Sequence, residues 1–175
     1  MVQASPNVGN YYVGKGVVKI NVTGIDSGWR LVGNCPTFEL TPQITKLAHY
    51  SAQRGTKFKD ANVTQIKELT LKMTFDEITP ENLQVALFGS ETGSTGLAHN
   101  ILDLDEIIAA VRFVGTNAVG DKQQVDLPTV SITPSGAIGF ISDGWAQIEL
   151  AGDVTADENG NFGTVYSGID GEIDP

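Results

Sequence analysis

The 175-residue sequence is poor in cysteine and histidine: it contains one cysteine, Cys35, and two histidines. A single cysteine excludes an internal disulfide framework and a zinc site built from several cysteines. No apolar run approaches the roughly 20 residues that a membrane-spanning helix needs. Residues 1–6 show no basic segment followed by an apolar one, so we expect no secretory signal peptide.

Basic residues are also scarce. The sequence has 11 Lys and Arg against 21 Asp and Glu, which gives a formal net charge of −10 and a pI of about 4.4. Because nucleic-acid phosphates and anionic membranes attract basic surfaces, this balance argues against tight binding to either. Hydrophobic residues make up 41% and charged residues 18% of the chain, the opposite of a disordered composition, so we expect one folded domain.

What the sequence does contain is a series of β-strand signals, separated by turns that use many of its 20 glycines. In residues 68–75, Leu69, Leu71, Met73 and Phe75 alternate with polar residues, which predicts a strand with one buried and one solvent-exposed face. Segments rich in β-branched and aromatic residues predict further strands over residues 11–22, 29–32, 38–47, 125–133, 146–154 and 162–166.

One short helix is predicted over residues 79–88. Thr79 suits the N-cap, Pro80 suits the first helical position, and Gly89 follows the last turn. Residues 101–114 fit either a helix or a strand. Together these elements predict a mainly β fold: an antiparallel β-sandwich or barrel-like arrangement with one short flanking α-helix.

The domain organisation follows from the polar segments. We expect residues 1–10 to form a flexible N-terminal arm, residues 11–167 to form a single domain, and the acidic residues 168–175 to form a flexible tail. The polar stretch 48–62 predicts a long inter-strand loop, and loops longer than about 12–15 residues are usually functional or disordered. Pro42 places its strand at a sheet edge or a bulge, because proline cannot donate to the ladder.

Catalytic motifs are incomplete. Residues 9–16 match the first seven positions of a phosphate-binding loop, but Gly16 stands where Ser or Thr should hold magnesium, and a strand rather than a helix follows. Cys35 with His49 or His99 would form a catalytic nucleophile–base pair only if the fold brought the two side chains together. The simpler interpretation is that Cys35 packs against its neighbours and that the histidine lies in a loop.

Metal sites are equally weakly indicated. Residues 157–161 resemble half of a calcium-binding loop but lack the Glu required at its twelfth position, so a hairpin turn is the simpler interpretation. Asp103, Asp105 and Glu106 fit a solvent-exposed face. We therefore predict that the chain is not an enzyme and binds no metal or cofactor.

Several segments form a recognisable series. In one of them, His49-Tyr50-Ser51 leads to Gly55-Thr56-Lys57-Phe58-Lys59-Asp60, and in another, the predicted strand ends before Thr79-Pro80-Glu81-Asn82. The full series comprises residues 28–35, 38–40, 47–60, 74–83, 112–117, 132–136 and 141–150. Taken in order, these segments resemble the major tail tube proteins of long, non-contractile-tailed bacteriophages, and the resemblance covers most of residues 28–155.

This resemblance implies a β-sandwich tail tube fold whose subunits form hexameric rings, with the rings stacked into a tube. Inward strands of six subunits would pair into one barrel around a lumen through which DNA passes during ejection. The implied partners are further copies of the chain and the tape measure, terminator and baseplate proteins of the tail, with DNA only in transit and no membrane. The implied location is the tail of the virion, with assembly in the host cytoplasm.

A ring would close the exposed sheet edges that otherwise invite aggregation. Six copies carry a formal charge of −60, six times −10, and acidic side chains on the inner wall would repel DNA phosphates. The candidates for lumen-facing residues are Glu39, Glu68 and Glu149, each on the polar side of a predicted strand, together with Lys72, which would locally oppose the acidic charge.

For contacts between rings we expect the polar segment 48–60 and the N-terminal arm. The candidate residues for these contacts are the charged residues of the 48–60 segment: Arg54, Lys57, Lys59 and Asp60. The alternative interpretation is that this segment is a solvated loop. Another tail component on the same architecture, such as a tail terminator or a contractile-type tube subunit, is the second hypothesis. A carbohydrate-binding β-sandwich module is a third, and it would need clustered exposed aromatic residues.

Overall fold

The computed structural model describes residues 6–7, 10–53, 55–92 and 98–174. The fold is mainly β and antiparallel, as the sequence predicts, with an eight-stranded sheet in the order β2-β1-β7-β8-β9-β4-β3, to which β10 adds by pairing with β8. The elements are β1 (Gly16–Val22), β2 (Arg30–Leu31), β3 (Thr37–Ser51), β4 (Phe58–Phe75), α1 (Pro80–Ala86), β5 (Ser90–Glu91), β6 (His99–Asn100), β7 (Ile107–Gly115), β8 (Gln123–Pro134), β9 (Ile148–Val154) and β10 (Thr164–Ser167).

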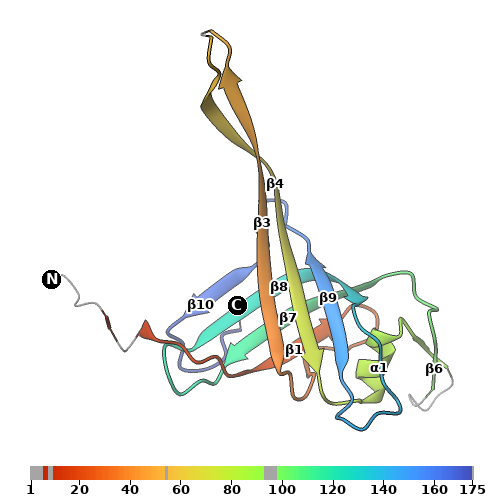
Figure 1. The fold of residues 1–175 in the computed structure, drawn as a ribbon. Coiled ribbons are helices and arrows are strands. Elements are labelled where there is room, and N and C mark those ends of the chain that lie inside the picture. Colours follow the sequence, from red (N-terminus) through yellow and green to blue (C-terminus); the bar gives the residue numbers. More distant parts are fainter. Residues whose placement is uncertain (1–5, 8–9, 54, 93–97, 175) are drawn as a thin grey trace.

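The large sheet folds over on itself at β8. The first residues of β8 pair with β10 through Gln123 to Asp126, whereas its last residues pair with β9 through Val130 to Pro134. As a result, β3, β4 and β9 form one layer that crosses a second layer of β1, β7, β8 and β10 (Figure 1). This is the sandwich-like arrangement that the sequence predicts.

The core lies between the two layers. The predicted alternation in residues 68–75 is confirmed up to Met73, because Leu71 and Met73 are buried while Glu68 and Lys72 are exposed. At the end of the strand Phe75 is buried as predicted, but Thr74 is buried as well. The buried apolar side chains meet the apolar faces of the other layer, and burying each large aliphatic or aromatic side chain contributes about 1.5–3 kcal/mol. The buried aliphatic residues of the core include Val18, Ile20, Ile107 and Ile132 in the other layer, and Ile148 and Leu150 on β9 in the same layer as β4.

The prediction of a long loop over residues 48–62 is wrong. β3 continues to Ser51 and β4 begins at Phe58, so only residues 52–57 connect them. The strand residues within 48–62 are mostly polar because both faces of the two-stranded ribbon meet solvent. A strand without a buried face shows no apolar alternation. The prediction for Pro42 is confirmed: it lies opposite Leu69 on β3, the last strand of the sheet.

Helix α1 begins as predicted. The Thr79 side chain accepts a hydrogen bond from the backbone N–H of Asn82 at 3.2 Å, and Pro80 occupies the first turn. The buried Asn82 then links the helix to β2 and the residue that follows it. Its Nδ2 donates to Val32 O at 2.9 Å, and its Oδ1 accepts from Arg30 at 2.7 Å. The ambiguous segment 101–114 contains strand β7 rather than a helix.

Gly33, in the turn after β2, has a backbone that an L side chain rarely adopts, with φ +85°, and a Cβ there would lie 2.3 Å from the Glu77 carboxyl carbon. We expect Gly33→Ala to lower the free energy of unfolding by about 1–3 kcal/mol, as measured by urea denaturation. Gly28→Ala is the matched control, because its added Cβ meets nothing within 4 Å and its φ is not left-handed. Equal stabilities of the two variants would contradict this account.

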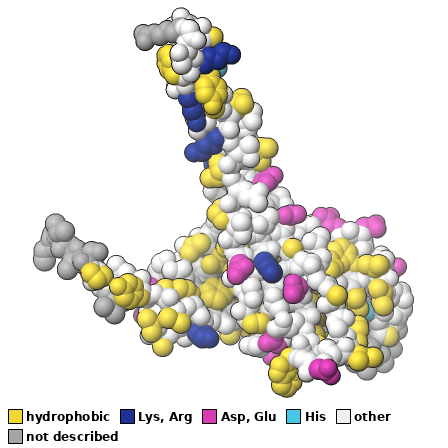
Figure 2. Space-filling model, in the orientation of Figure 1, with side chains coloured by type: hydrophobic (Ala, Val, Ile, Leu, Met, Phe, Trp, Pro, Cys, Tyr) yellow, Lys and Arg dark blue, Asp and Glu magenta, His cyan; other side chains and the backbone are white. Residues whose placement is uncertain are grey.

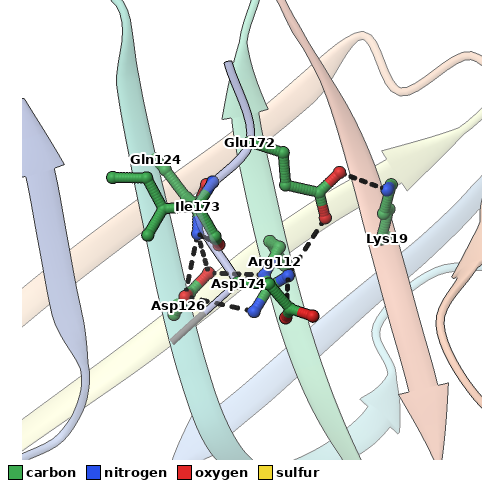
Figure 3. A network of polar contacts seen from close by, with 7 residues as sticks. All are labelled: Lys19, Arg112, Gln124, Asp126, Glu172, Ile173 and Asp174. Carbon is green, nitrogen blue, oxygen red and sulfur yellow. Dashed lines mark hydrogen bonds and ion pairs between the residues drawn. The ribbon is translucent and has the colours of Figure 1, made fainter. Parts of the chain in front are cut away.

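The described part of the C-terminal tail, residues 168–174, differs from the free tail that the sequence suggests. Glu172 pairs with Lys19 and with Arg112, the latter at 3.0 Å, and Gln124 exchanges two hydrogen bonds with the backbone of Ile173 (Figure 3). The tail docks because its carboxylates meet basic groups on the outer face of β1 and β7. Most of the predicted N-terminal arm, residues 1–10, lies outside the described residues.

Within the described ranges, no helix is long and apolar enough to span a membrane.

Candidate assembly surface

The most conspicuous feature is the β3–β4 hairpin, which projects well beyond the two-layer body (Figure 1). We call residues 44–67 the hairpin extension. Nearly all of its described side chains are exposed, including every residue from 58 to 67. Six of them are large hydrophobic residues, each 48–63% exposed: Ile44, Leu47, Tyr50, Phe58, Val63 and Ile66.

Below the extension, the outer face of β3, β4 and β9 is polar. Directly paired residues share a face of a sheet, and Glu39 pairs with Lys72 while Gln43 pairs with Glu68. β9 pairs with the other edge of β4, where Thr74 pairs with Glu149. Glu149 therefore lies on the same face of the sheet as Lys72 and Glu68. We call this surface the polar face, and all four sequence candidates for the lumen lie on it.

Asp153 also belongs to the polar face, because it pairs with Thr70 two residues from Lys72. Asp153 is not among the residues predicted from the sequence, although it alternates with Glu149 along β9 and the same period of two identifies it. Its addition gives the polar face four carboxylates around one ammonium group. Figure 2 shows acidic side chains on both sides of a basic one over these strands.

Further along the hairpin, the same face becomes apolar. Leu47 pairs with Val63, and Thr45 pairs with Ile66, so Val63 and Ile66 continue the face that carries Glu68 nearer the body. The apolar character was hidden in the sequence by two β-bulges in the ladder, which fall between Thr45 and Lys46 and between His49 and Tyr50. Each bulge adds one residue to β4 and shifts the phase of its alternation.

The opposite face of the extension is basic. Lys46 and Lys67 lie at its base, and Lys59 pairs with Tyr50 near the tip. Of the predicted inter-ring residues, Lys59 is exposed on this face and Lys57 is exposed in the connection between β3 and β4. Asp60 is exposed as well, and its Oδ1 lies 2.6 Å from the Nδ1 of His49.

The remaining inter-ring candidate, Arg54, lies outside the described residues.

Charge is strongly segregated between the extension and the rest of the chain. By sequence, residues 44–67 contain five Lys and Arg and one Asp, a formal charge of +4. The other residues contain six Lys and Arg and 20 Asp and Glu, a formal charge of −14. The described extension therefore appears blue and yellow against a body dotted with magenta in Figure 2. One copy thus presents a basic protrusion and an acidic body, two surfaces of opposite charge.

The outer edge of β3 is open. Among the described residues β3 pairs with β4 alone, so one side of a 15-residue strand presents unpaired backbone groups. Such an edge is a template for pairing with another chain unless it is blocked. Pro42 lacks an N–H and Lys46 is charged, and both are devices that discourage indiscriminate edge pairing.

The nucleophile candidates are not brought together. Burial raises the pKa of Cys35 to about 11, and its Sγ donates to Thr37 O at 3.1 Å, so the thiol is protonated at neutral pH. His49 lies on the hairpin extension, and the ring nitrogens of His99 are buried without a hydrogen-bond partner in the described chain. Gly16 begins β1, where a Cβ would collide with the Phe113 ring.

The outer face of the layer formed by β1, β7, β8 and β10 holds an open cavity of about 600 Å³, lined in part by Trp29, Tyr166 and Asp157. The guanidinium carbon of Arg112 lies 4.6 Å from the centre of the Trp29 ring. One face of this indole is therefore already covered by a cation, which leaves less of it for stacking on a sugar.

The sequence identifies the family. The chain belongs to the family described as "Protein of unknown function UCP028589", whose model matches residues 11–99. That match runs from before β1 to the start of β6 and includes the whole hairpin and α1. No curated protein matches the chain. Family membership therefore names no activity.

Proposed function

We propose that the chain is a structural subunit that assembles with copies of itself into stacked hexameric rings, forming a phage tail tube through which DNA is ejected. The observation that carries this proposal is the hairpin extension: an apolar and basic ribbon held away from an acidic body. The hexameric ring and the phage setting come from the sequence resemblance to tail tube proteins.

The extension favours association on energetic grounds. Its six large hydrophobic side chains are about half exposed, and burying the remainder contributes about 1 kcal/mol for each side chain. Those gains are needed, because association costs at least about 4 kcal/mol in lost translational and rotational freedom. The open edge of β3 adds backbone hydrogen bonds when a neighbouring strand pairs with it. Repetition around a ring multiplies both contributions.

The polar face suits the wall of a DNA conduit. Glu39, Glu68, Glu149 and Asp153 share it with a single Lys72, so its formal charge is −3. If six copies turn this face inward, the wall repels phosphates. DNA then slides without being held, consistent with a function in transit rather than in binding.

A charge reversal tests the lumen assignment. In virions that carry Glu39→Lys, Glu68→Lys or Glu149→Lys, we expect DNA ejection to slow several-fold, because a lysine ring attracts the passing phosphates. Ejection kinetics in vitro measure the effect. Glu158→Lys is the control, since Glu158 lies in an exposed turn away from the polar face. Unchanged kinetics in all three variants would remove these residues from the lumen.

Negative-stain electron microscopy of the concentrated protein tests the function itself. Tubes with a regular axial repeat support the proposal. Rings that never stack support the alternative of a tail terminator, and a persistent monomer that binds sugar supports the carbohydrate-binding alternative. A persistent monomer under all conditions, including nucleation by preformed tails, would end the proposal.

A further inference from the structure

The loop between β8 and β9, residues 135–147, exposes three large hydrophobic side chains to solvent. Phe140 is 71%, Ile141 is 99% and Trp145 is 95% exposed. Ile138 anchors this loop, because it packs against the core. Three neighbouring apolar side chains at such exposure are unusual for a surface that meets only water, and they mark an interaction site.

This loop lies at the end of the molecule opposite the hairpin extension. It ends at Gln147, whose Nε2 donates to Asp76 Oδ1 at 2.9 Å, and the next residue, Ile148, pairs with Phe75 at the end of β4. The extension forms the beginning of the same 18-residue strand, so along β4 the hairpin tip lies about 55 Å from the loop and Val63 lies about 40 Å from it. Figure 1 shows the β8–β9 loop at the bottom and the hairpin tip at the top.

The charges around the two sites are opposite. Asp143 lies within the loop, and Asp76, Glu77 and Glu81 follow the end of β4 beside it. The sequence has no Lys or Arg between residues 73 and 111 or after residue 122. Arg30 lies beside Glu81, but its guanidinium already pairs with Asp26 at 2.9 Å, so carboxylates remain in excess at this end of the body. The extension, with its formal charge of +4, is the complementary surface that the same chain supplies.

We infer that the β8–β9 loop is the docking site for the hairpin extension of a second copy of this chain. The apolar residues Leu47 and Val63 of one copy would cover Ile141 and Trp145 of the next, while the lysines near the hairpin tip meet the surrounding carboxylates. Because the two sites lie at opposite ends of one molecule, the contact is head-to-tail and propagates along an axis instead of closing on itself. This inference rests on the proposed self-assembly and names the surface that stacks one ring on the next.

Intermolecular crosslinking tests the contact directly. Chains carrying Leu47→Cys are mixed with chains carrying Trp145→Cys, assembled, and treated with a short bismaleimide that bridges about 10 Å. We expect a covalent heterodimer, identified by mass spectrometry as a 47–145 linkage. Val165→Cys replaces Trp145→Cys in the control, because Val165 is an exposed residue of β10 remote from the loop. The native Cys35 interferes little, since burial keeps its thiol protonated.

A loop variant gives the second readout. Ile141→Ser with Trp145→Ser should leave the thermal unfolding of the monomer unchanged, because both side chains are almost fully exposed, and should raise the critical concentration for tubes at least tenfold. Tubes that form without the 47–145 linkage, or at the unmodified concentration from this variant, would overturn the inference and leave the proposed function standing. Failure of the unmodified chain to assemble at all would overturn both.

Discussion

Replacing Leu47 and Val63 together by threonine should abolish tube formation at concentrations where the unmodified chain assembles. The two side chains pair directly on the apolar part of the hairpin extension and are 57% and 63% exposed. Threonine is β-branched, as strands favour, so the strands are kept, but the two substitutions remove about 2 kcal/mol of apolar burial from each intermolecular contact. In the proposed hexameric assembly, six such contacts would join each ring to the next, so the loss per ring is large enough to prevent stacking.

The measurements are sedimentation of assembled material against concentration and negative-stain imaging of the pellet. Circular dichroism and thermal unfolding should match those of the unmodified chain, because neither side chain contributes to the core. Val165→Thr, a similar change at a similarly exposed strand residue of β10, is the control and should assemble normally. Normal tubes from the double variant would show that the extension does not hold the assembly together.

The sequence predicts this molecule well where burial imposes a period. Residues 68–75 sit between a buried layer and solvent, so their alternation identifies the strand, its inward face and the carboxylates of the polar face. The helix could be predicted equally well, because Thr79 and Pro80 act through local hydrogen bonding and backbone geometry that no distant residue can change. The fold class follows from several such local signals in series.

Prediction failed where the structure depends on pairing between distant segments. Residues 44–67 form a ribbon with two exposed faces, so they show no buried period, and the bulges opposite Lys46 and Tyr50 shift what alternation remains. The docked tail depends on Arg112 and Gln124, which lie about 50 to 60 residues before it. Sequence spacing carries no signal for contacts of that kind, so the tail resembles a free acidic end.

Arg112 lies at the centre of the contacts that hold the tail. Its side chain is 4% exposed, its Nε donates to Asp126 at 2.9 Å, and its Nη1 donates to Glu172 and Asp174 at 3.0 and 3.1 Å. Burial alone would lower the pKa of Arg112, but hydrogen bonds with Glu172, Asp174 and Asp126 outweigh it and raise the pKa. The cation is thus fully charged, largely buried and dependent on its partners.

We expect Arg112→Met to lower the free energy of unfolding by about 3–5 kcal/mol, because it leaves the carboxylate of Asp126 poorly solvated and without its cation. Urea denaturation measures the loss. Adding Asp126→Asn should restore part of it, since the double variant no longer holds an unpaired charge there. A single variant as stable as the unmodified chain would show that the network contributes little to folding.

The tail offers a milder test of the same network through pH. Hydrogen bonds from Lys19 and then from Arg112 hold the pKa of Glu172 below its usual value of 4.5. A carboxylate whose pKa is lower in the folded chain stabilises it above the unfolded pKa, and this contribution disappears as the pH falls through the folded pKa. Glu172→Gln should therefore be less stable than the unmodified chain at pH 7, by about 1 kcal/mol or less for such a partly exposed pair, and the gap should close well below pH 4.5. A gap that is constant between pH 7 and pH 3 would mean that the docked tail is held by the backbone hydrogen bonds between Gln124 and Ile173 rather than by charge.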